Sequence, residues 1–490
     1  MRLNAEWCYA VIKSRDRRFD GKFFTGVKTT GIYCRPICPA VTPRAENVAF
    51  FNSAAAAEGA GFRPCLRCRP ESAPGTPEWS GNSALVSRAL GHLSNGLLDE
   101  HGVDELARRL NVGARHLRRL FAEEIGASPQ AVARSRRVAF AKKLIEETSL
   151  PMSEIAFSAG FSSIRRFNDA FRHAYRRTPT ELRRGGGAAV GTAGVERNGR
   201  LSLKLYYRPP YDWLSMMQFL SARAVPGLES VAGGTYRRSF ALGDVAGQLE
   251  ARPDEFEHRV ILTVPLEGAR FLMAIAERVR NIFDLNSDPA AIARHLGRDA
   301  LLSGILAEHE GLRVPGTWDG FEMVVRAIVG QQVTVKGART LVGRLVRSFG
   351  RPMPEKVGAN DGFVFPQPEA LADAELERTG IIRSRANAIR SLARCVCEGT
   401  LSLETAPSLE SGIATLMALP GVGRWTAEYI AMRALREPDA FPVGDLGLRR
   451  SMEKIEGLHL SEQEFEMRAE NWRPWRAYAA IALWRVDTGR

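Results

Sequence analysis

Four cysteines before residue 70 constrain the fold of this chain more than any other feature. They form two pairs, Cys34-x3-Cys38 and Cys65-x2-Cys68, with 26 residues between the pairs. Two close thiolate pairs are typical of a tetrahedral zinc site, in which each pair supplies two ligands. We therefore predict that one zinc ion, bound by Cys34, Cys38, Cys65 and Cys68, organises a small N-terminal domain.

The sulfur atoms of such a site can do chemistry as well as bind the metal. Four thiolates around one Zn²⁺ leave a net charge of about −2, which keeps the sulfurs nucleophilic. An electrophilic methyl group placed beside them could then be attacked. The spacing alone leaves open whether the zinc is only structural or also activates a cysteine.

The chain has 490 residues, enough for about three domains. Its net charge of +13 is uneven: residues 1–80 carry 12 basic and 7 acidic side chains, residues 81–187 carry 18 and 11, and residues 188–490 carry 38 and 37. The basic excess before residue 188 favours a polyanionic partner. Because no apolar run of about 18 residues and no signal peptide is evident, we expect a cytoplasmic, nucleoid-associated protein without a membrane partner.

Two stretches of small and polar residues, 70–82 and 183–200, predict linkers that divide the chain into three blocks. The third block begins with aromatic and β-branched segments broken by turns and becomes helical from about residue 268. We expect a small antiparallel-sheet subdomain followed by an all-α domain.

The middle block contains an internal repeat at an offset of 49 to 50 residues, since Phe121 and Ser128-Pro129 recur as Phe171 and Thr178-Pro179. Each copy predicts a helix, a turn and a second helix. The second helix of the second copy is expected to pack through Ile164, Phe167 and Phe171. The opposite faces carry the candidate DNA-binding residues Arg115, Arg118, Arg165 and Arg166. For these arginines, a merely solvated helix face is the alternative.

The pattern GFSS…F…FR…TP at 160–179 resembles the paired helix-turn-helix domain of AraC-type activators, with Arg176 where that family usually has Gly.

The segments TTGIYCRPIC at 29–38, RAENVAFF at 44–51 and GFRPCLRC at 61–68 resemble the N-terminal domain of the Ada DNA-repair protein. The Ada resemblance implies that Cys34 is both a zinc ligand and the acceptor of a methyl group from a DNA methylphosphotriester. It also implies DNA contacts at Thr30 and Arg67, and tighter DNA binding after methylation.

Two apolar helices flank Pro-Gly-Val-Gly in LMALPGVGRWTAEYIAMRAL at 416–435. Gly421 and Gly423 let backbone N–H groups approach a DNA phosphate without obstruction by side chains. Asp445 follows 22 residues after Gly423. By itself, an aspartate at this position is more often a helix N-cap than a catalyst.

Together with FEMVVRAIVGQQVTVKGA at 321–338, this region resembles the helix-hairpin-helix DNA glycosylases, and YYRPPYDW at 206–213 narrows the resemblance to the AlkA type, 3-methyladenine DNA glycosylase II. The resemblance implies that Asp445 is the catalytic carboxylate and that Gln332 is inserted into the DNA stack. It also implies a monovalent cation at the hairpin. The base pocket would be lined by Trp425, Tyr429 and Trp484, for which ordinary core packing is the alternative.

Residues and motifs that are missing from the sequence restrict the reactions that we expect of this chain. No lysine occurs between Lys356 and Lys454, so a lyase Schiff base has no support and we expect a monofunctional enzyme. Beyond residue 68 only Cys395 and Cys397 remain, too few for a four-cysteine iron–sulfur cluster. The O6-alkylguanine transferase motif PCHR is missing. Leu446 stands where relatives can carry an aromatic, which predicts a roomier pocket.

We therefore predict a multidomain, mainly α protein that excises N-alkylated purines and transfers methyl groups to Cys34, coupled to transcriptional activation. The alternative is a non-enzymatic activator whose glycosylase-like part only binds DNA. The expected partners of this monomer are alkylated and promoter double-stranded DNA and RNA polymerase. The predicted parts are a zinc methyl-acceptor domain at 1–75, a double helix-turn-helix domain at 82–184, a linker at 185–202, an α+β subdomain at 203–312 and a glycosylase domain at 313–490.

Overall fold

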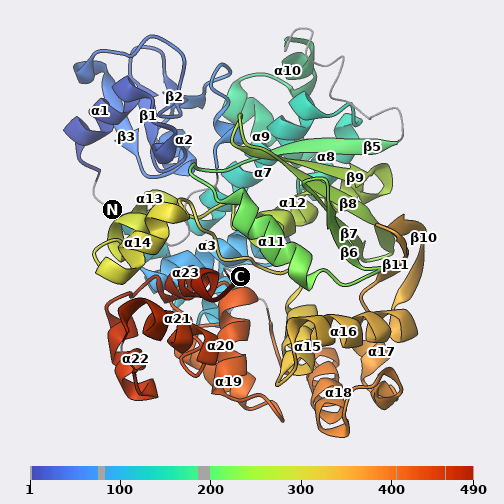
Figure 1. The fold of residues 1–490 in the computed structure, drawn as a ribbon. Helices are drawn as coiled ribbons and strands as arrows, with labels where there is room; N and C mark the ends of the chain where they lie inside the picture. Colours follow the sequence, from blue (N-terminus) through green and yellow to red (C-terminus); the bar gives the residue numbers. More distant parts are fainter. Residues whose placement is uncertain (1–2, 75–82, 186–198, 404–405, 458, 489–490) are drawn as a thin grey trace. The chain divides into compact units, whose positions relative to one another are not determined.

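The computed structural model describes residues 3–74, 83–185, 199–403, 406–457 and 459–488. The chain forms two compact units, whose elements are labelled in Figure 1. The first unit comprises residues 1–209, 251–277 and 285–288, and the second comprises residues 210–250, 278–284 and 289–490. No helix among the described residues is long and apolar enough to span a membrane.

The first unit begins with a small sheet and two helices. These elements are α1 (Ala5–Ser14), β1 (Phe24–Val27), β2 (Ile32–Cys34), β3 (Val48–Phe51), α2 (Ala54–Gly59) and β4 (Arg63–Pro64). The strand order is β3-β1-β2-β4; β1 pairs antiparallel with β2 and β3, and β2 pairs parallel with β4. Buried clusters around Cys8 and Phe23, and around Phe24 and Tyr33, give this part an apolar core separate from the paired cysteines.

Eight helices follow in the first unit: α3 (Ala84–Ser94), α4 (Leu97–Glu100), α5 (Val103–Arg109), α6 (Ala114–Glu124), α7 (Pro129–Glu147), α8 (Met152–Ser158), α9 (Ile164–Tyr175) and α10 (Pro179–Gly185). The predicted repeat is present as α5–α6 and α8–α9. Both turns use the left-handed backbone region at the matching residue, Asn111 with φ 54° and Gly160 with φ 78°. The repeat therefore extends to backbone conformation.

The two copies differ at the end of their second helix. Gly126 has φ 78° after α6, and Arg176 has φ 55° after α9. A left-handed residue at this point favours glycine, because a Cβ atom adds strain there. One packing prediction was wrong: Ile164 is 44% exposed at the start of α9, whereas Phe167 and Phe171 are fully buried.

The predicted linkers are only partly described. Residues 70–72 form a short 3-10 helix, η3, in which the Ser72 side chain is buried. The first predicted linker therefore begins later than expected, and its remainder, 75–82, lies outside the described residues. Residues 183–185 belong to α10, residues 186–198 lie outside the described residues, and the next strand starts at Arg200.

The predicted small sheet has five strands: β5 (Arg200–Tyr206), β6 (Glu229–Ala232), β7 (Thr235–Leu242), β8 (Val245–Asp254) and β9 (Arg259–Pro265). Their order is β5-β9-β8-β7-β6, and the pairs β5–β9 and β6–β7 are antiparallel. Alternate residues of β5 and β9 are buried, the period-two pattern of a sheet with one covered face.

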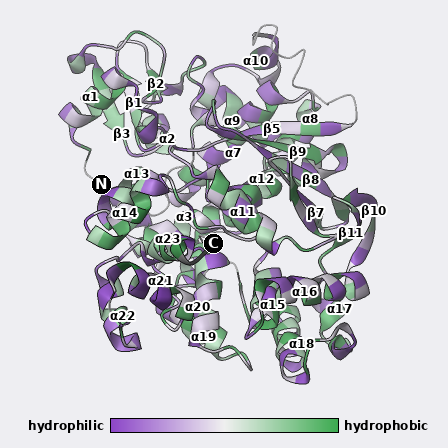
Figure 2. Ribbon diagram, viewed as in Figure 1, coloured by the Kyte–Doolittle hydropathy of each residue, from purple (hydrophilic) through white to green (hydrophobic). Residues whose placement is uncertain are grey.

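The remaining helices are α11 (Trp213–Arg223), α12 (Leu272–Ile282), α13 (Pro289–Leu296), α14 (Ala300–Glu308), α15 (Gly320–Gly330), α16 (Val335–Phe349), α17 (Pro368–Leu371), α18 (Arg383–Cys397), α19 (Leu409–Met417), α20 (Arg424–Arg433), α21 (Leu446–Glu456), α22 (Glu462–Glu470) and α23 (Arg476–Thr488). Residues 477–483 of α23 are all buried, and this helix is coloured largely hydrophobic in Figure 2, unlike α22. Helix α23 thus belongs to the core of the second unit.

A β-hairpin interrupts these helices, which the sequence analysis did not predict. It consists of β10 (Arg351–Val357) and β11 (Asn360–Val364), joined by a turn at Gly358 with φ 65°. Pro352 and Pro354 argue against a strand in the sequence, because proline cannot donate to a ladder. A two-stranded ribbon tolerates them, and its register shifts between Met353 and Val357.

Candidate metal centre and candidate active site

Strand pairing brings the two cysteine pairs together. Because β2 and β4 are parallel, with Tyr33 opposite Pro64, Cys34 and Cys65 follow at the same level of the sheet. The sulfur atoms of Cys34, Cys38, Cys65 and Cys68 all lie within 4.8 Å of one another. Zinc–sulfur bonds of about 2.3 Å in a tetrahedron require similar sulfur separations, so the four residues fit one zinc ion.

The four thiols differ in exposure and in acidity. Cys65 and Cys68 are buried, whereas Cys34 and Cys38 are partly exposed. Hydrogen bonds among the thiols raise the pKa of Cys34 and Cys68 and lower that of Cys65, and they lower the pKa of Cys38 to about 7. A reagent from solution can therefore approach the first pair more easily than the second.

Arg35, which the sequence analysis did not single out, makes two hydrogen bonds to Cys68 of the cysteine cluster. Its backbone N–H donates to Cys68 Sγ at 3.3 Å, and its guanidinium donates to the Cys68 carbonyl at 3.1 Å. The same buried guanidinium pairs with Asp20. Its two contacts with Cys68 fix the position of this cysteine in the cluster, while Asp20 balances the guanidinium charge. Only its position next to Cys34 could have suggested this role.

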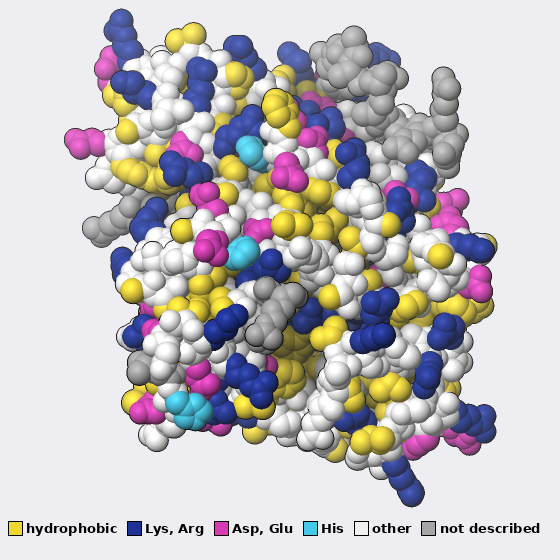
Figure 3. Space-filling view, viewed as in Figure 1, with side chains coloured by type: hydrophobic (Ala, Val, Ile, Leu, Met, Phe, Trp, Pro, Cys, Tyr) yellow, Lys and Arg dark blue, Asp and Glu magenta, His cyan; other side chains and the backbone are white. Residues whose placement is uncertain are grey.

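The six side chains predicted to contact DNA in the first unit are all exposed: Thr30, Arg67, Arg115, Arg118, Arg165 and Arg166. Two of them have acidic neighbours at 4.0 Å, Asp104 near Arg118 and Asp169 near Arg165. Exposed pairs at this distance are weak and leave a guanidinium available to a phosphate. Basic side chains also occur over the whole face of the molecule visible in Figure 3, without forming a single patch.

Asp445 proves to be a helix cap and a pocket residue at the same time. It is the N-cap of α21, where Oδ1 accepts from the Leu448 N–H at 2.9 Å. Trp425 Nε1 donates to Oδ2 at 2.9 Å, and Trp484 Nε1 donates to Oδ1 at 3.0 Å. Three N–H donors therefore hold the carboxylate in one orientation. The sequence left open whether Asp445 is a helix N-cap or a catalytic carboxylate, and this geometry is compatible with both.

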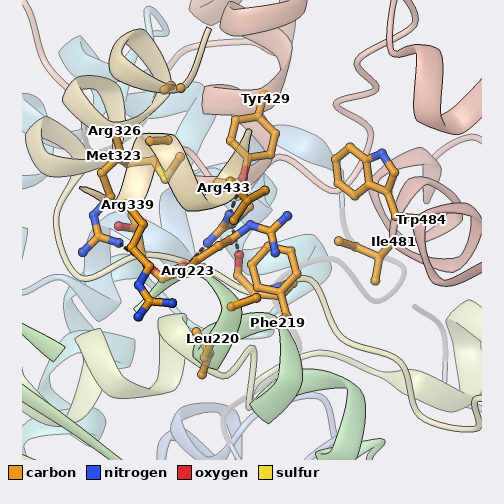
Figure 4. A pocket seen from close by; sticks show the side chains of 18 of the residues that line it. Phe219, Leu220, Arg223, Met323, Arg326, Arg339, Tyr429, Arg433, Ile481 and Trp484 are labelled. Carbon is orange, nitrogen blue, oxygen red and sulfur yellow. Dashed lines mark hydrogen bonds between the residues drawn. The ribbon is translucent and has the colours of Figure 1, made fainter. Parts of the chain in front are cut away.

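The predicted aromatic residues surround the same cavity, which has a volume of about 1000 Å³. Trp425 and Tyr429 stack with ring centroids 5.4 Å apart and planes within 8°, and Trp484 meets Tyr429 nearly edge-on at 6.1 Å. Figure 4 shows Tyr429 and Trp484 beside the pocket, together with Phe219. These aromatic residues are partly accessible from the cavity, in contrast to residues of the closed core.

Sequence reasoning missed a group of arginines in this pocket. Arg433 Nη1 donates to Tyr429 Oη at 2.7 Å, and its guanidinium lies 4.8 Å from the centroid of Phe219. Arg223 lies over the same ring at 3.8 Å. Figure 4 shows both guanidiniums between Tyr429 and Phe219. The spacing of Tyr429 and Arg433, four residues apart on one helix, was the available signal.

The glycine hairpin joins α19 to α20. Gly421 has φ 75°, and Gly423 is the N-cap of α20; both are exposed, and a Cβ atom at Gly423 would meet nothing within 4 Å. The Gln331 side chain donates to the Gly421 carbonyl at 2.8 Å. The neighbouring Gln332 is exposed, with φ 54°. The Gln331 side chain therefore connects the glycine hairpin to the loop that contains Gln332.

Leu446 follows the carboxylate but is 54% exposed and does not line the cavity. Its neighbour Gly447 does line it. The Leu446 side chain therefore takes up no space in the cavity, and the roomier pocket stays a prediction.

Four family models match successive parts of the chain. They describe the metal-binding domain of Ada (residues 7–71), a helix-turn-helix domain (106–185), the AlkA N-terminal domain (202–319) and the HhH-GPD superfamily of base excision DNA repair proteins (325–477). A probable bifunctional transcriptional activator/DNA repair enzyme AlkA of Mycobacterium tuberculosis is 43% identical over 98% of this chain and 96% of its own length. The chain belongs to this family of bifunctional AlkA proteins.

Two further proteins match a little over half of the chain. DNA-3-methyladenine glycosylase 2 of Escherichia coli is 35% identical over 58% of this chain and 96% of its own length. The structure of a 3-methyladenine DNA-glycosylase from Archaeoglobus fulgidus, 24% identical, covers 58% of this chain and 98% of its own length with a TM-score of 0.52, a likeness in fold. The resemblances predicted from the sequence, and the fold class, are confirmed.

Proposed function

We propose that this bifunctional AlkA protein hydrolyses the N-glycosidic bond of N-alkylated purines such as 3-methyladenine in DNA, and that it separately takes up methyl groups from DNA methylphosphotriesters on Cys34. The observation that carries the first activity is the carboxylate of Asp445, fixed by Trp425 and Trp484 at the wall of an aromatic cavity. A cap alone would not need two indole donors.

In the proposed excision, the flipped base lies against Trp425, Tyr429 and Trp484. An N-alkylated purine is cationic, so the aromatic faces attract it, and its electron-poor ring leaves readily. As the bond from the sugar C1′ to the base breaks, positive charge develops on the sugar and Asp445 stabilises it. Water then bonds to C1′ and gives up a proton, for which Asp445 is the acceptor.

Three further residues would hold the opened duplex. Gly421 and Gly423 present backbone N–H groups at the start of α20, where a phosphate is stabilised by the helix dipole. We assign a monovalent cation to the same hairpin. Gln332, exposed in a left-handed conformation, would fill the space that the flipped base leaves.

The proposed methyl transfer uses the partly exposed Cys34. Its thiolate attacks the methyl carbon of the triester, so an S–C bond forms, the C–O bond breaks and the phosphate leaves as a diester anion. Zinc, when bound by the four cysteines, keeps these thiols deprotonated at neutral pH. Neutralising one thiolate lowers the negative charge that faces DNA, and binding by the exposed basic residues tightens.

The tighter complex would switch on transcription through the two helix-turn-helix units. Arg115, Arg118, Arg165 and Arg166 lie on the second helix of each unit, the position of a major-groove reader. We propose promoter DNA and RNA polymerase as partners of a monomeric protein. We keep the predicted domain boundaries at residues 75, 82, 184, 202 and 312 as part of this proposal.

One experiment tests both activities together. The protein is incubated with methylated duplex DNA, free bases are measured by chromatography, and its peptides are analysed by mass spectrometry. We expect release of 3-methyladenine with turnover and one methyl group on Cys34. Absence of released bases, with methylated Cys34, would support the non-enzymatic activator instead. A methyl group on Cys395 or Cys397 with Cys34 unmodified would contradict the acceptor assignment.

A further inference from the structure

The part of the cavity around Arg433 contains polar groups that the proposed excision does not use, the guanidinium of Arg433 and the hydroxyl group of Tyr429. Trp425, Tyr429 and Arg433 follow one another at intervals of four residues on α20, so Arg433 lies about 12 Å along the helix from Trp425. The indole of Trp425 binds Asp445, whereas Arg433 binds the hydroxyl of Tyr429. The cavity therefore has the anionic Asp445 near the first turn of α20 and the cationic Arg433 at the last residue of this helix.

We propose that Tyr429, held by Arg433 beside Arg223, donates a hydrogen bond to an acceptor atom on the flipped base, so that the pocket prefers purines with an oxygen at position 6 over purines with an amino group at position 6. This inference rests on the proposed glycosylase function and adds a substrate preference to it.

The hydrogen-bonding capacity of a phenol fixes the direction of its proton. The Tyr429 oxygen accepts from Arg433 Nη1 at 2.7 Å. A guanidinium has donors only, so neither arginine can accept the phenolic proton. Within the described parts of the chain, no acceptor is bonded to that O–H group. The proton remains available to a molecule in the cavity.

The two arginines are themselves held in place. Arg433 is buried, donates to the Gly316 carbonyl at 3.0 Å and also bonds the Pro315 carbonyl. Both guanidiniums stack on Phe219, as Figure 4 shows. The Tyr429 hydroxyl is therefore oriented before any base binds, so no free energy is spent on reorienting it during the reaction.

The surrounding charges strengthen this donor. Burial alone would raise the pKa of Tyr429, but the positive charges of Arg433 and Arg223 outweigh burial and lower it. As the glycosidic bond breaks, electron density moves onto the base, and an acceptor oxygen becomes a better partner for the phenol. An amino group at that edge would instead place a donor against a donor and leave both unpaired.

Two substrates of equal charge isolate the hydrogen bond. 7-Methylguanine and 3-methyladenine are both cationic in DNA, but the first carries an oxygen at position 6 and the second an amino group. Tyr429→Phe keeps the ring that stacks on Trp425 and removes only the hydroxyl. In single-turnover assays we expect release of 7-methylguanine by this variant to fall by about tenfold or more relative to release of 3-methyladenine.

Tyr211→Phe is the matched control, because its hydroxyl donates to the Phe283 carbonyl at 2.6 Å and Tyr211 does not line the cavity. This variant should leave the ratio of the two rates unchanged. Arg223→Met, which removes a positive charge near Tyr429 and leaves the hydrogen bond from Arg433, should lower the same ratio by a smaller factor. An equal loss on both substrates in Tyr429→Phe overturns the donor assignment, whereas a wild-type protein that releases neither base overturns the proposed function itself.

Discussion

The four cysteines of the candidate metal centre come from one short stretch of chain, whereas the pocket around Asp445 is lined by residues between Asp212 and Arg485. The first site is built from two turns at the ends of paired strands. The second needs α11, α20, α21 and α23 in place at once. Substitutions at one site should therefore leave the other site's chemistry intact, and the four predictions that follow are tests of that independence.

Cys34→Ser has the largest expected effect, a complete loss of methyl uptake from DNA methylphosphotriesters. A serine hydroxyl is a much poorer nucleophile and zinc ligand than a thiolate. Excision of 3-methyladenine should persist. Peptide mass spectrometry after incubation with methylated DNA measures the first result and base release the second. Cys397→Ser, which changes an exposed cysteine outside the cluster, is the control.

Asp445→Asn should lower excision by a factor on the order of 10² or more, because it removes the charge that stabilises the cationic sugar. The asparagine oxygen can still cap α21 and accept from Trp484, but its amide then faces the Trp425 N–H, donor to donor. DNA binding through Gly421 and Gly423 should survive, as a gel-shift assay can show.

Asp299→Asn is a closely matched control for that variant. Asp299 is also an N-cap, and it accepts from the indole of Trp472 at 2.9 Å, yet it does not line the cavity. Asp299 also pairs with Arg468 at 3.2 Å, so the melting temperature of Asp299→Asn should fall at least as much as that of Asp445→Asn. Undiminished excision in Asp445→Asn, or an equal loss in Asp299→Asn, would refute the catalytic assignment.

Gln332→Ala should lower excision from duplex DNA by about tenfold, because the alanine side chain is too short to fill the vacated stack, and unstacking costs a few kcal/mol. Excision from single-stranded DNA should change less. Gln367→Ala, which changes another exposed glutamine, is the control. The same loss on both kinds of DNA would argue against insertion of Gln332. Methyl uptake by Cys34 should not change.

Methylation of Cys34 has the smallest expected effect, a several-fold gain in promoter affinity. One unit of charge near a phosphate, with partial screening, contributes about 1 kcal/mol. Footprinting of methylated and unmethylated protein at matched salt measures the gain, with Cys34→Ser protein as the reference that cannot change state. Equal affinities would indicate a repair-only protein.

The cysteine spacing by itself predicted the four residues whose sulfur atoms the structure brings together, because a zinc site imposes short sequence separations on its ligands. The repeat predicted both helix-turn-helix units for a similar reason, since a turn of only a few residues between two helices has few conformations. Ile164 shows where helical periodicity fails to predict burial. The periodicity places Ile164 on the same face as Phe167, but the start of α9 extends beyond the core and leaves Ile164 exposed.

Residues of the Asp445 pocket were partly recognised from their resemblance to a family, and the local sequence alone favoured a cap. Only the tertiary structure showed that the same carboxylate caps α21 and accepts from two indoles, one of them 39 residues away. Arg223 and Phe219 lie about 200 residues before Tyr429, and no sequence spacing connects them. Their approach depends on packing between α11 and the helical core, because hydrophobic burial brings together segments that share no local pattern.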